Sequence, residues 1–220
     1  MSAVVFDMDG VAIDSEAHWR GVETESLLRH LTPGAALDHK RLMGLSMEGF
    51  HRALSADYGL AMSYAEFVLL YRDMARRIYE ERCALMPGFL ELLEASRAAG
   101  LKVALASSSP DEWVDLIVDR FDLRARLHAV VSADRVGGKG KPAPDVYLEA
   151  MRRLGLAPRA GVGIEDSRNG LLSAHAAGLA CVALRNGFND EQDLSAAELE
   201  VLSLRELDPE RLRRLAAERG

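Results

Sequence analysis

Cysteine is scarce in this chain, and long hydrophobic runs are missing from it. Among 220 residues, Cys83 and Cys181 are too few for a disulfide framework and too far apart for a Cys-x-x-Cys metal motif. No apolar segment approaches membrane-spanning length, and no basic flank with an apolar signal core precedes the first predicted strand. We therefore expect two packing cysteines in a reducing compartment, and a soluble, cytoplasmic protein with no membrane partner.

An excess of positive charge is also missing. The chain has 27 Lys and Arg against 34 Asp and Glu, for a net charge of −7, and it has no long basic run. A nucleic-acid backbone is therefore not an expected partner. The apolar fraction of 49% and the charged fraction of 28% are ordinary for a soluble globular protein. We find no internal repeat or low-complexity segment, and we expect a monomer.

The pattern of apolar residues changes twice along the chain. Residues 15–86 contain no convincing strand, and their periodicity predicts helices. From Pro87-Gly88 onward, short β-rich runs alternate with helical stretches, which is typical of a parallel sheet with crossover helices. The predicted helices of the first region are 17–30, 36–43, 47–58 and 64–82; the strands of the second are 101–106, 129–132, 161–164 and 180–184; a terminal helix is predicted at 208–219.

These patterns predict an α/β fold with a Rossmann-like parallel-sheet core and an inserted helical cap. The core is expected to contain residues 1–14 and 87–220, because another apolar strand begins at Ala3. Residues 15–86 would form the cap. An insertion joined by two hinge segments can act as a lid that excludes water and selects a substrate.

The first strand ends in two acids, in the run Phe6-Asp7-Met8-Asp9-Gly10. Strand ends at the carboxyl edge of an open α/β sheet are where such proteins bind ligands. Asp7 and Asp9 could hold a hard cation such as Mg²⁺, and one of them could attack an electrophile. An EF-hand loop is excluded, because it needs a further ligand before the glycine and a later glutamate. A turn with solvated acids is the alternative for an isolated pair.

Three later strand ends also carry polar residues. Ser107-Ser108-Ser109 precedes a predicted helix, and its hydroxyl and N–H groups could bind an anion or simply cap that helix. Lys141 lies on a loop stiffened by prolines, where a lone lysine is usually solvent-exposed. Glu165-Asp166 ends another strand, and a shared cation would relieve the repulsion of the two carboxylates. Together with Asp7 and Asp9, these clusters favour a functional site over separate structural roles.

The four clusters resemble the four motifs of the haloacid dehalogenase superfamily, in their usual order and spacing. The resembling segments are Asp7-Met8-Asp9-Gly10-Val11, Ser107, Lys141 in Lys-Pro-Ala-Pro-Asp, and Glu165-Asp166. The helical insertion between the first and second motifs is similar to the cap of the branch that contains β-phosphoglucomutase and small sugar phosphatases. The resemblance covers nearly the whole chain.

The resemblance implies a role for each matching residue. Asp7 would be the nucleophile, forming an aspartyl-phosphate and contributing an oxygen to Mg²⁺. Asp9 would be the general acid and base and would bind the metal through its backbone carbonyl. Ser107, with the N–H of Ser108, would hold phosphoryl oxygens, and Lys141 would neutralise them. Metal ligation would be completed by Asp166, with Glu165 either a further ligand or a neighbour that supports the others.

Within the family, the sequence favours hydrolysis over phosphoryl transfer to a sugar. β-Phosphoglucomutases carry a histidine at the cap entry and an arginine in the cap, and the aligned positions here hold Trp19 and Met47, although His18 and Arg52 are nearby. We therefore expect a phosphatase acting on a small phosphorylated metabolite, such as a sugar phosphate, with a phosphosugar mutase as the alternative. Glu16, His18 and Trp19 are the cap residues expected to contact the substrate.

A different functional class shares this chemistry. Phospho-accepting regulatory domains also combine a strand-end aspartate, an acid pocket with Mg²⁺, a hydroxyl and a lysine on a parallel sheet. Such domains are roughly half as long as this chain and lack an inserted cap. The length and the insertion therefore favour an enzyme. The lifetime of the phosphoaspartate would distinguish the two classes.

Overall fold

The structure is a computed structural model that describes residues 2–35, 37 and 47–218. The chain divides into two compact units, one formed by the segment up to Glu16 and the segment from Cys83 onward, and the other by Ala17–Arg82. These bounds lie a few residues inside the predicted insertion, 15–86. The helix predicted at 36–43 falls, apart from residue 37, outside the described residues.

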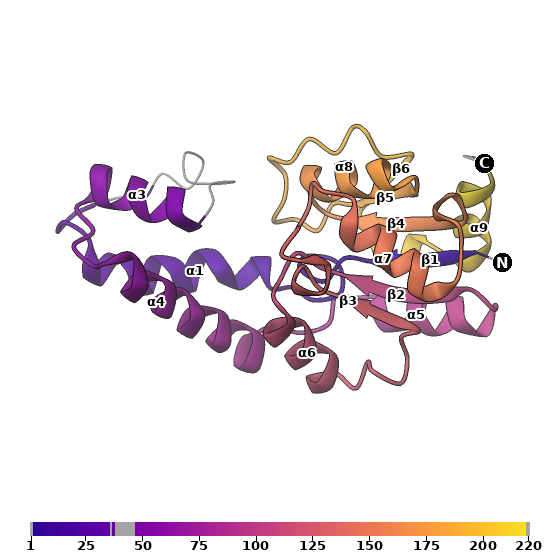
Figure 1. Ribbon diagram of the computed structural model, residues 1–220, viewed down its shortest axis with the longest axis horizontal. Coiled ribbons are helices and arrows are strands. Elements are labelled where there is room, and N and C mark those ends of the chain that lie inside the picture. The colour runs from indigo at the N-terminus through magenta and orange to yellow at the C-terminus, as the bar shows by residue number, and fades with distance from the viewer. Residues whose placement is uncertain (1, 36, 38–46, 219–220) are drawn as a thin grey trace. The chain divides into compact units, whose positions relative to one another are not determined.

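The first unit contains a six-stranded sheet in the order β3-β2-β1-β4-β5-β6, with every neighbouring pair parallel (Figure 1). The predicted fold class, a Rossmann-like parallel sheet with flanking helices, is therefore confirmed. The edge strand β6 was not predicted, because three residues with one buried side chain give too short a pattern. The strands are β1 (Ala3–Phe6), β2 (Lys102–Ala106), β3 (Ala129–Val131), β4 (Gly161–Glu165), β5 (Ala180–Leu184) and β6 (Leu199–Val201).

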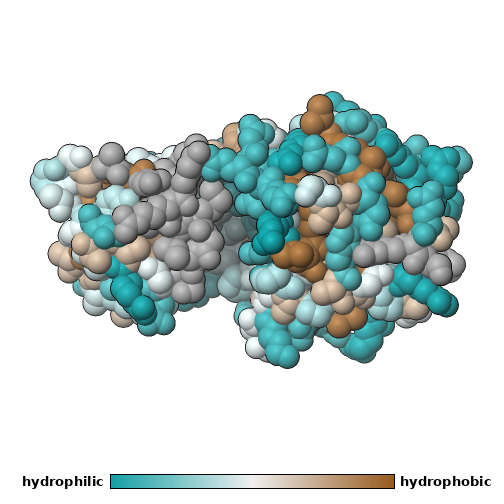
Figure 2. All heavy atoms as spheres, turned by 90° about the horizontal axis from the view of Figure 1, so that it is seen from above, coloured by the Kyte–Doolittle hydropathy of each residue, from teal (hydrophilic) through white to brown (hydrophobic). Residues whose placement is uncertain are grey.

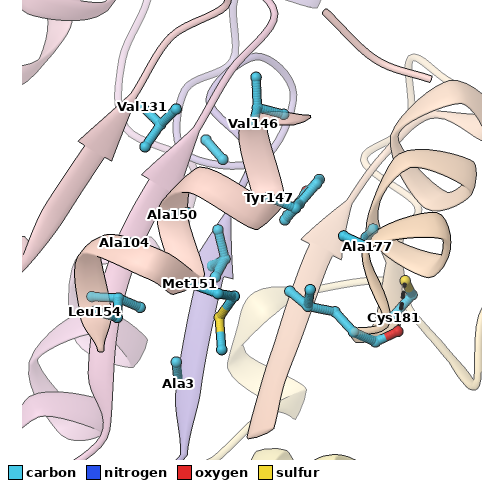
Figure 3. Packing of buried hydrophobic residues seen from close by; sticks show 14 of the residues in the cluster. Ala3, Ala104, Val131, Val146, Tyr147, Ala150, Met151, Leu154, Ala177 and Cys181 are labelled. Carbon is cyan, nitrogen blue, oxygen red and sulfur yellow. Dashed lines mark hydrogen bonds between the residues drawn. The ribbon is translucent and has the colours of Figure 1, made fainter. Parts of the chain in front are cut away.

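Helices cover both faces of this sheet because the buried strands alternate their side chains between the faces. On one face, Ala3 and Val5 belong to a buried cluster that includes Tyr147 and Met151 of α7 (Figure 3). On the other face, Phe6 packs edge-to-face on Phe89 of α5, with ring centroids 5.1 Å apart. The helices of this unit are α5 (Phe89–Ala98), α6 (Asp111–Arg120), α7 (Asp145–Leu154), α8 (Arg168–Ala177) and α9 (Pro209–Glu218), with short 3₁₀ turns η3 (Asp134–Val136), η4 (Pro158–Ala160) and η5 (Leu204–Glu206).

The two segments that lead out of and back into the first unit are hydrogen-bonded to each other. The Asp14 N–H donates to the Ala84 carbonyl at 3.1 Å, and the Ala84 N–H donates to Asp14 Oδ1 at 2.6 Å. Ile13 and Leu85 form an antiparallel bridge, and the Met86 N–H donates to the Ala12 carbonyl. The exit and return of the chain are therefore joined within the sheet-containing unit.

The second unit is helical and packs around aromatic side chains. Phe67 and Tyr71 of α4 contact each other and Phe50 of α3, with centroid distances from 4.8 to 5.8 Å. Ser63 begins α4 with a capping box to Glu66. The helix predicted at 64–82 is α-helical only in its first part. The elements are α1 (Glu16–Leu27, beginning at the last residue of the first unit), η1 (Leu28–His30), α3 (Met47–Tyr58), α4 (Tyr64–Arg77) and the π-helical turn η2 (Ile78–Arg82).

The surface of the sheet-containing unit is mostly polar on the face seen in Figure 2, where brown hydrophobic spheres form small areas among teal ones. Exposed leucines on this unit include Leu148 of α7, Leu172 of α8 and Leu202 after β6. Scattered apolar residues of this kind are normal on soluble proteins. No helix in the described part of the chain is both long and apolar enough to cross a membrane.

Candidate active site

The ends of β1 and β4 lie next to each other at the point where the strand order reverses. Phe6 is in register with Ile164, and the Asp7 N–H extends the ladder by donating to the Ile164 carbonyl at 3.0 Å. Connections leave β1 and β4 toward opposite edges of the sheet, which opens a crevice at their carboxyl ends. Asp7 and Asp166 are therefore brought together from distant parts of the sequence.

Three carboxylates and one lysine form the centre of the site. Oxygens of Asp7, Glu165 and Asp166 lie within 4.8 Å of one another. Lys141 Nζ is 2.5 Å from Asp7 Oδ1 and 2.6 Å from Glu165 Oε1. The carboxylate residues are 7%, 0% and 6% exposed and the lysine side chain 6%, so these charges are nearly removed from water. Such burial makes each charge depend on its partners.

Burial and mutual repulsion change the protonation of this cluster. Burial, the Glu165 charge and the Asp9 charge raise the pKa of Asp7 from 3.8 to about 8, although Lys141 opposes the shift. Burial, with the charges of Asp7 and Glu165, also raises the pKa of Asp166 well above its usual value. Burial opposes the charge on Lys141, but the two facing carboxylates raise its pKa overall. With all three carboxylates ionised, the cluster would carry more negative charge than one lysine can compensate, and without a bound cation this excess favours protonation of Asp7 and Asp166.

This excess of negative charge fits a divalent cation. A doubly charged ion would balance the charge that remains from three carboxylates and one lysine. The donors are all oxygens, as Mg²⁺ prefers, and Glu165 Oε2 is buried without a hydrogen-bond partner among the described residues. Asp7, Asp166 and Glu165 could therefore hold Mg²⁺, and the carbonyl of Asp9 stays a predicted further ligand.

The raised pKa of Asp7 predicts a pH-dependent stability in the presence of a chelator. Between pH 4 and pH 8 the unfolded chain ionises Asp7 while the folded protein keeps it protonated, so the free energy of unfolding should fall as pH rises through this window. The slope from this group approaches about 1.4 kcal/mol per pH unit. Urea unfolding of wild type and Asp7→Asn in EDTA measures it, because titratable groups far from this cluster contribute equally to both proteins. Equal slopes for the two proteins would contradict the assignment, and Mg²⁺ should reduce the slope of the wild type.

Asp9 is held by two hydroxyl groups. Ser15, which is fully buried, donates to Asp9 Oδ1 at 2.7 Å, and Ser109 donates to Asp9 Oδ2 at 3.0 Å. Gly10 follows with a φ of +75°, and a Cβ there would lie 2.0 Å from Asp166 Oδ2. The glycine therefore lets the turn after β1 pass close to the Asp166 carboxylate. Ser15 was absent from the predicted site residues, and Ser109 was named only as part of the serine cluster expected to bind an anion or cap a helix.

The serine loop after β2 connects to the lysine loop. Ser107 is 1% exposed, and its Oγ accepts a hydrogen bond from the Ser109 N–H at 3.0 Å. Ser108 Oγ accepts from the Lys141 N–H at 2.9 Å, next to the cis peptide between Lys141 and Pro142. The Ser108 side chain thus holds the lysine loop, a contact that the sequence did not predict. Its predicted role in phosphate binding concerns the N–H group and stays a prediction.

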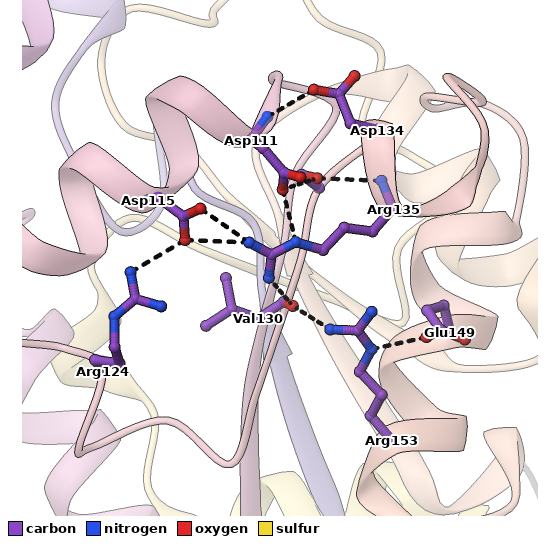
Figure 4. A network of polar contacts seen from close by, with 9 residues as sticks. Asp111, Asp115, Arg124, Val130, Asp134, Arg135, Glu149 and Arg153 are labelled. Carbon is purple, nitrogen blue, oxygen red and sulfur yellow. Dashed lines mark hydrogen bonds and ion pairs between the residues drawn. The ribbon is translucent and has the colours of Figure 1, made fainter.

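A partly exposed network of ion pairs and hydrogen bonds around Arg135 connects the segments that follow the two loops and precede them (Figure 4). The guanidinium lies 2.6 Å from Asp111 Oδ1 at the start of α6 and donates to both oxygens of Asp115 at 3.1 Å. It also donates to the Val130 carbonyl on β3 at 2.9 Å. Arg135 lies in η3, just before the lysine loop, so it ties the helix after the serine loop to the segment that carries Lys141.

Two asparagines after β5 support Asp166. Asn186 Nδ2 donates to Asp166 Oδ2 at 2.9 Å and to the Gly10 carbonyl at 3.0 Å. Asn189 Nδ2 donates to the carbonyls of Asp166 and Leu184. Neither residue was predicted as a site residue. The signal that found the other clusters, polar residues directly after a buried strand, also applies to Asn186.

The predicted cap residues have different positions. Glu16 is exposed at the end of the first unit, and its charge contributes to the raised pKa of Asp166. His18 and Trp19 are half-buried in the helical unit, where Trp19 stacks on Tyr71 with ring centroids 6.2 Å apart. This contact gives Trp19 a packing role. Substrate contact by these three residues stays a prediction.

Known proteins resemble this chain over most of its length. A family model described as haloacid dehalogenase-like hydrolase matches residues 1–178. Protein CbbY of Rhodobacter capsulatus is 32% identical over 217 residues, covering 93% of this chain and 94% of the relative. Hexitol phosphatase B of Escherichia coli K12 is 32% identical over 181 residues, covering 80% of this chain and 79% of the relative. The crystal structure of a proposed β-phosphoglucomutase from Thermotoga maritima has a TM-score of 0.77 and 28% identity, covering 99% of both chains.

Proposed function

The chain belongs to the haloacid dehalogenase-like hydrolases, the family that its motifs resemble, and within it we propose a Mg²⁺-dependent phosphatase of small phosphorylated metabolites. One observation carries the proposal. Lys141 Nζ lies 2.5 Å from Asp7 Oδ1 inside a buried cluster of acids at the ends of β1 and β4. Together with a bound Mg²⁺, this arrangement would present a nucleophile and two cations to a dianionic phosphoryl group.

In the first step, a carboxylate oxygen of Asp7 would attack phosphorus, forming a P–O bond as the bond to the leaving oxygen breaks. Asp9 would give its carboxyl proton to that leaving oxygen, so the product departs as a neutral alcohol. Lys141 would donate to a phosphoryl oxygen, and the hydroxyl of Ser107 would hold another. The product of this step is an aspartyl-phosphate on Asp7.

In the second step, water would attack the phosphorus of the aspartyl-phosphate. The Asp9 carboxylate, now ionised, would take a proton from that water, and the bond between phosphorus and the Asp7 oxygen would break to release phosphate. Its two serine partners, Ser15 and Ser109, support this role because they fix the Asp9 carboxylate beside Asp7. Mg²⁺ bound by Asp7 and Asp166 would neutralise phosphoryl charge during both steps.

The substrate class is inferred from the relatives. Hexitol phosphatase B is named for a phosphorylated sugar alcohol, and it shares 32% identity with this chain. We propose that this enzyme also hydrolyses a phosphorylated sugar or related metabolite. Trp19 and Met47, at positions where the resemblance to phosphosugar mutases would require histidine and arginine, favour water as the acceptor.

A phosphate-release screen tests the proposed function. Wild type and Asp7→Asn are incubated with Mg²⁺ and a panel of phosphorylated metabolites, and inorganic phosphate is measured. We expect phosphate release by wild type and not by Asp7→Asn, and we expect no release by wild type when EDTA removes Mg²⁺. β-Glucose 1-phosphate with a trace of its bisphosphate is the mutase control. Conversion to glucose 6-phosphate without phosphate release would overturn the hydrolase assignment, and a phosphoaspartate that persists for minutes would instead indicate signalling.

A further inference from the structure

A tyrosine that the proposed mechanism does not use lies beside Lys141. Tyr147 lies on α7, shortly after the lysine loop, and it is fully buried. We propose that Tyr147 is a positioning residue that aligns Lys141 for phosphoryl transfer by fixing the carboxylate of Glu165. The inference rests on the proposed phosphatase function, because it concerns the alignment of a cation that this function requires.

Tyr147, Lys141 and Glu165 each contact the other two. Its hydroxyl donates to Glu165 Oε1, the same oxygen that lies 2.6 Å from Lys141 Nζ. Its ring is also close to the ammonium group, with Nζ 5.3 Å from the ring centroid, which is within the range of a cation–π contact. Tyr147 therefore contacts Lys141 directly through its ring and indirectly through its hydroxyl.

The position of Glu165 matters because Lys141 has only one N–H donor left for a phosphoryl oxygen. An ammonium group has three N–H donors, and here Asp7 Oδ1 and Glu165 Oε1 accept from it. The direction of the third donor is set by where those two acceptors lie. If Glu165 rotates, the ammonium moves with it, and a phosphoryl oxygen meets a misaligned donor. Small displacements of this kind reduce the rate of an enzyme far more than its affinity for substrate.

Gly170 leaves room for the Glu165 carboxylate on the other side. A Cβ at position 170 would lie 1.7 Å from Glu165 Oε2, so the carboxylate occupies space that an alanine would take. Gly170 is in the first turn of α8, where its N–H donates to Ser167 Oγ at 3.1 Å. Oε1 of Glu165 is thus hydrogen-bonded from α7, and Oε2 has its place because α8 carries a glycine at position 170.

The test compares two tyrosine-to-phenylalanine variants. Tyr147→Phe removes the hydroxyl and keeps the ring beside Lys141. Tyr71→Phe is the matched control, because Tyr71 is also buried and its hydroxyl also donates to a glutamate, Glu23, in the helical unit. We expect Tyr147→Phe to lower kcat about tenfold, as for loss of one hydrogen bond to a charged group, and to change KM less than about twofold. Tyr71→Phe should leave both within about twofold of wild type.

Two further variants show whether Tyr147 acts through Glu165. In a Glu165→Met background, Tyr147→Phe should have no additional effect on kcat, because the hydroxyl has lost its acceptor. Gly170→Ala should also lower kcat about tenfold or more, although alanine ordinarily stabilises a helix relative to glycine. Thermal unfolding identifies any variant that fails to fold. Tyr147→Phe, Gly170→Ala and Glu165→Met change Glu165 or its surroundings at three different positions, so the failure of one variant to fold leaves the others informative.

Metal binding, measured without turnover, separates this role from metal ligation. Titration calorimetry with Mg²⁺ should give affinities for wild type and Tyr147→Phe within about threefold, since the hydroxyl contacts Glu165 Oε1, the oxygen that faces Lys141, and not Oε2, the oxygen left for a metal ion. An unaltered kcat in Tyr147→Phe, additive effects with Glu165→Met, or recovery of kcat at high Mg²⁺ would each overturn the inference. If wild type releases no phosphate from any substrate in the screen, the proposed function fails instead, so the two failures are distinguishable.

Discussion

Asp7→Asn is expected to lower kcat on the order of 10⁴-fold or more, the scale seen when a catalytic nucleophile is removed. An amide oxygen is a much weaker nucleophile than a carboxylate, and it cannot form the acyl-phosphate. The side chain keeps its size, so the Asp7 N–H bond to Ile164 and the packing of β1 should be unchanged. Steady-state phosphate release measures the loss, and acid-quenched protein should carry phosphate in wild type but not in the variant.

The control for this variant is Asp73→Asn, which makes the same change at an exposed position on α4. Its kcat and KM should match those of wild type. Asp7→Asn itself should unfold at a higher urea concentration than wild type at pH 8 in EDTA, because it removes a buried carboxyl whose pKa is raised to about 8. Near-native turnover by Asp7→Asn would rule out Asp7 as the nucleophile.

The second large effect is expected for Lys141→Met. The substitution keeps a long side chain but removes the ammonium group that faces Asp7 and Glu165. Loss of a preorganised donor to the phosphoryl group should lower kcat/KM by about 10²- to 10³-fold. Removal of one partner from a buried ion pair typically costs about 3–5 kcal/mol of folding stability, because the remaining charges are left uncompensated.

Lys139→Met provides the matched control. Lys139 lies on the same loop, but its side chain is 66% exposed and it pairs with Asp145 at 3.3 Å, so activity and stability should change little. The stability loss of Lys141→Met in EDTA should be larger at pH 8 than at pH 5, where the raised pKa keeps Asp7 protonated in the folded protein. A variant with unchanged stability at both pH values would show that Lys141 does not compensate these carboxylates.

The sheet and the centre of the site were predictable because both follow from local patterns. Buried β-rich runs between helices fix a parallel sheet, and parallel strands bring their carboxyl ends to one edge. Asp7, Lys141 and Glu165 could therefore be placed together from the sequence alone. The helix at Met47–Tyr58 was predicted with its observed bounds, since its apolar periodicity ends at the Tyr58-Gly59 breaker.

The supporting contacts could not be predicted in the same way. In the sequence, Tyr147 has the pattern of a core-facing residue on an amphipathic helix. Only the packing of α7 on β4 shows that its hydroxyl donates a hydrogen bond to Glu165. Ser15 and Asn189 reach the site through turns, whose side-chain directions depend on backbone geometry that periodicity does not describe. Asn186 is the exception, because it follows β5 as the other polar clusters follow their strands.

The hydrogen bonds between Asp14 and Ala84 have a consequence for how this architecture can diversify. Because the exit and return segments are already paired, the sheet-containing unit is closed at this point regardless of the segment between Ala17 and Arg82. The entropy cost of a longer or shorter connection grows only slowly with its length. Evolution can therefore exchange or resize the inserted module while the strand ends, and the chemistry they carry, stay constant.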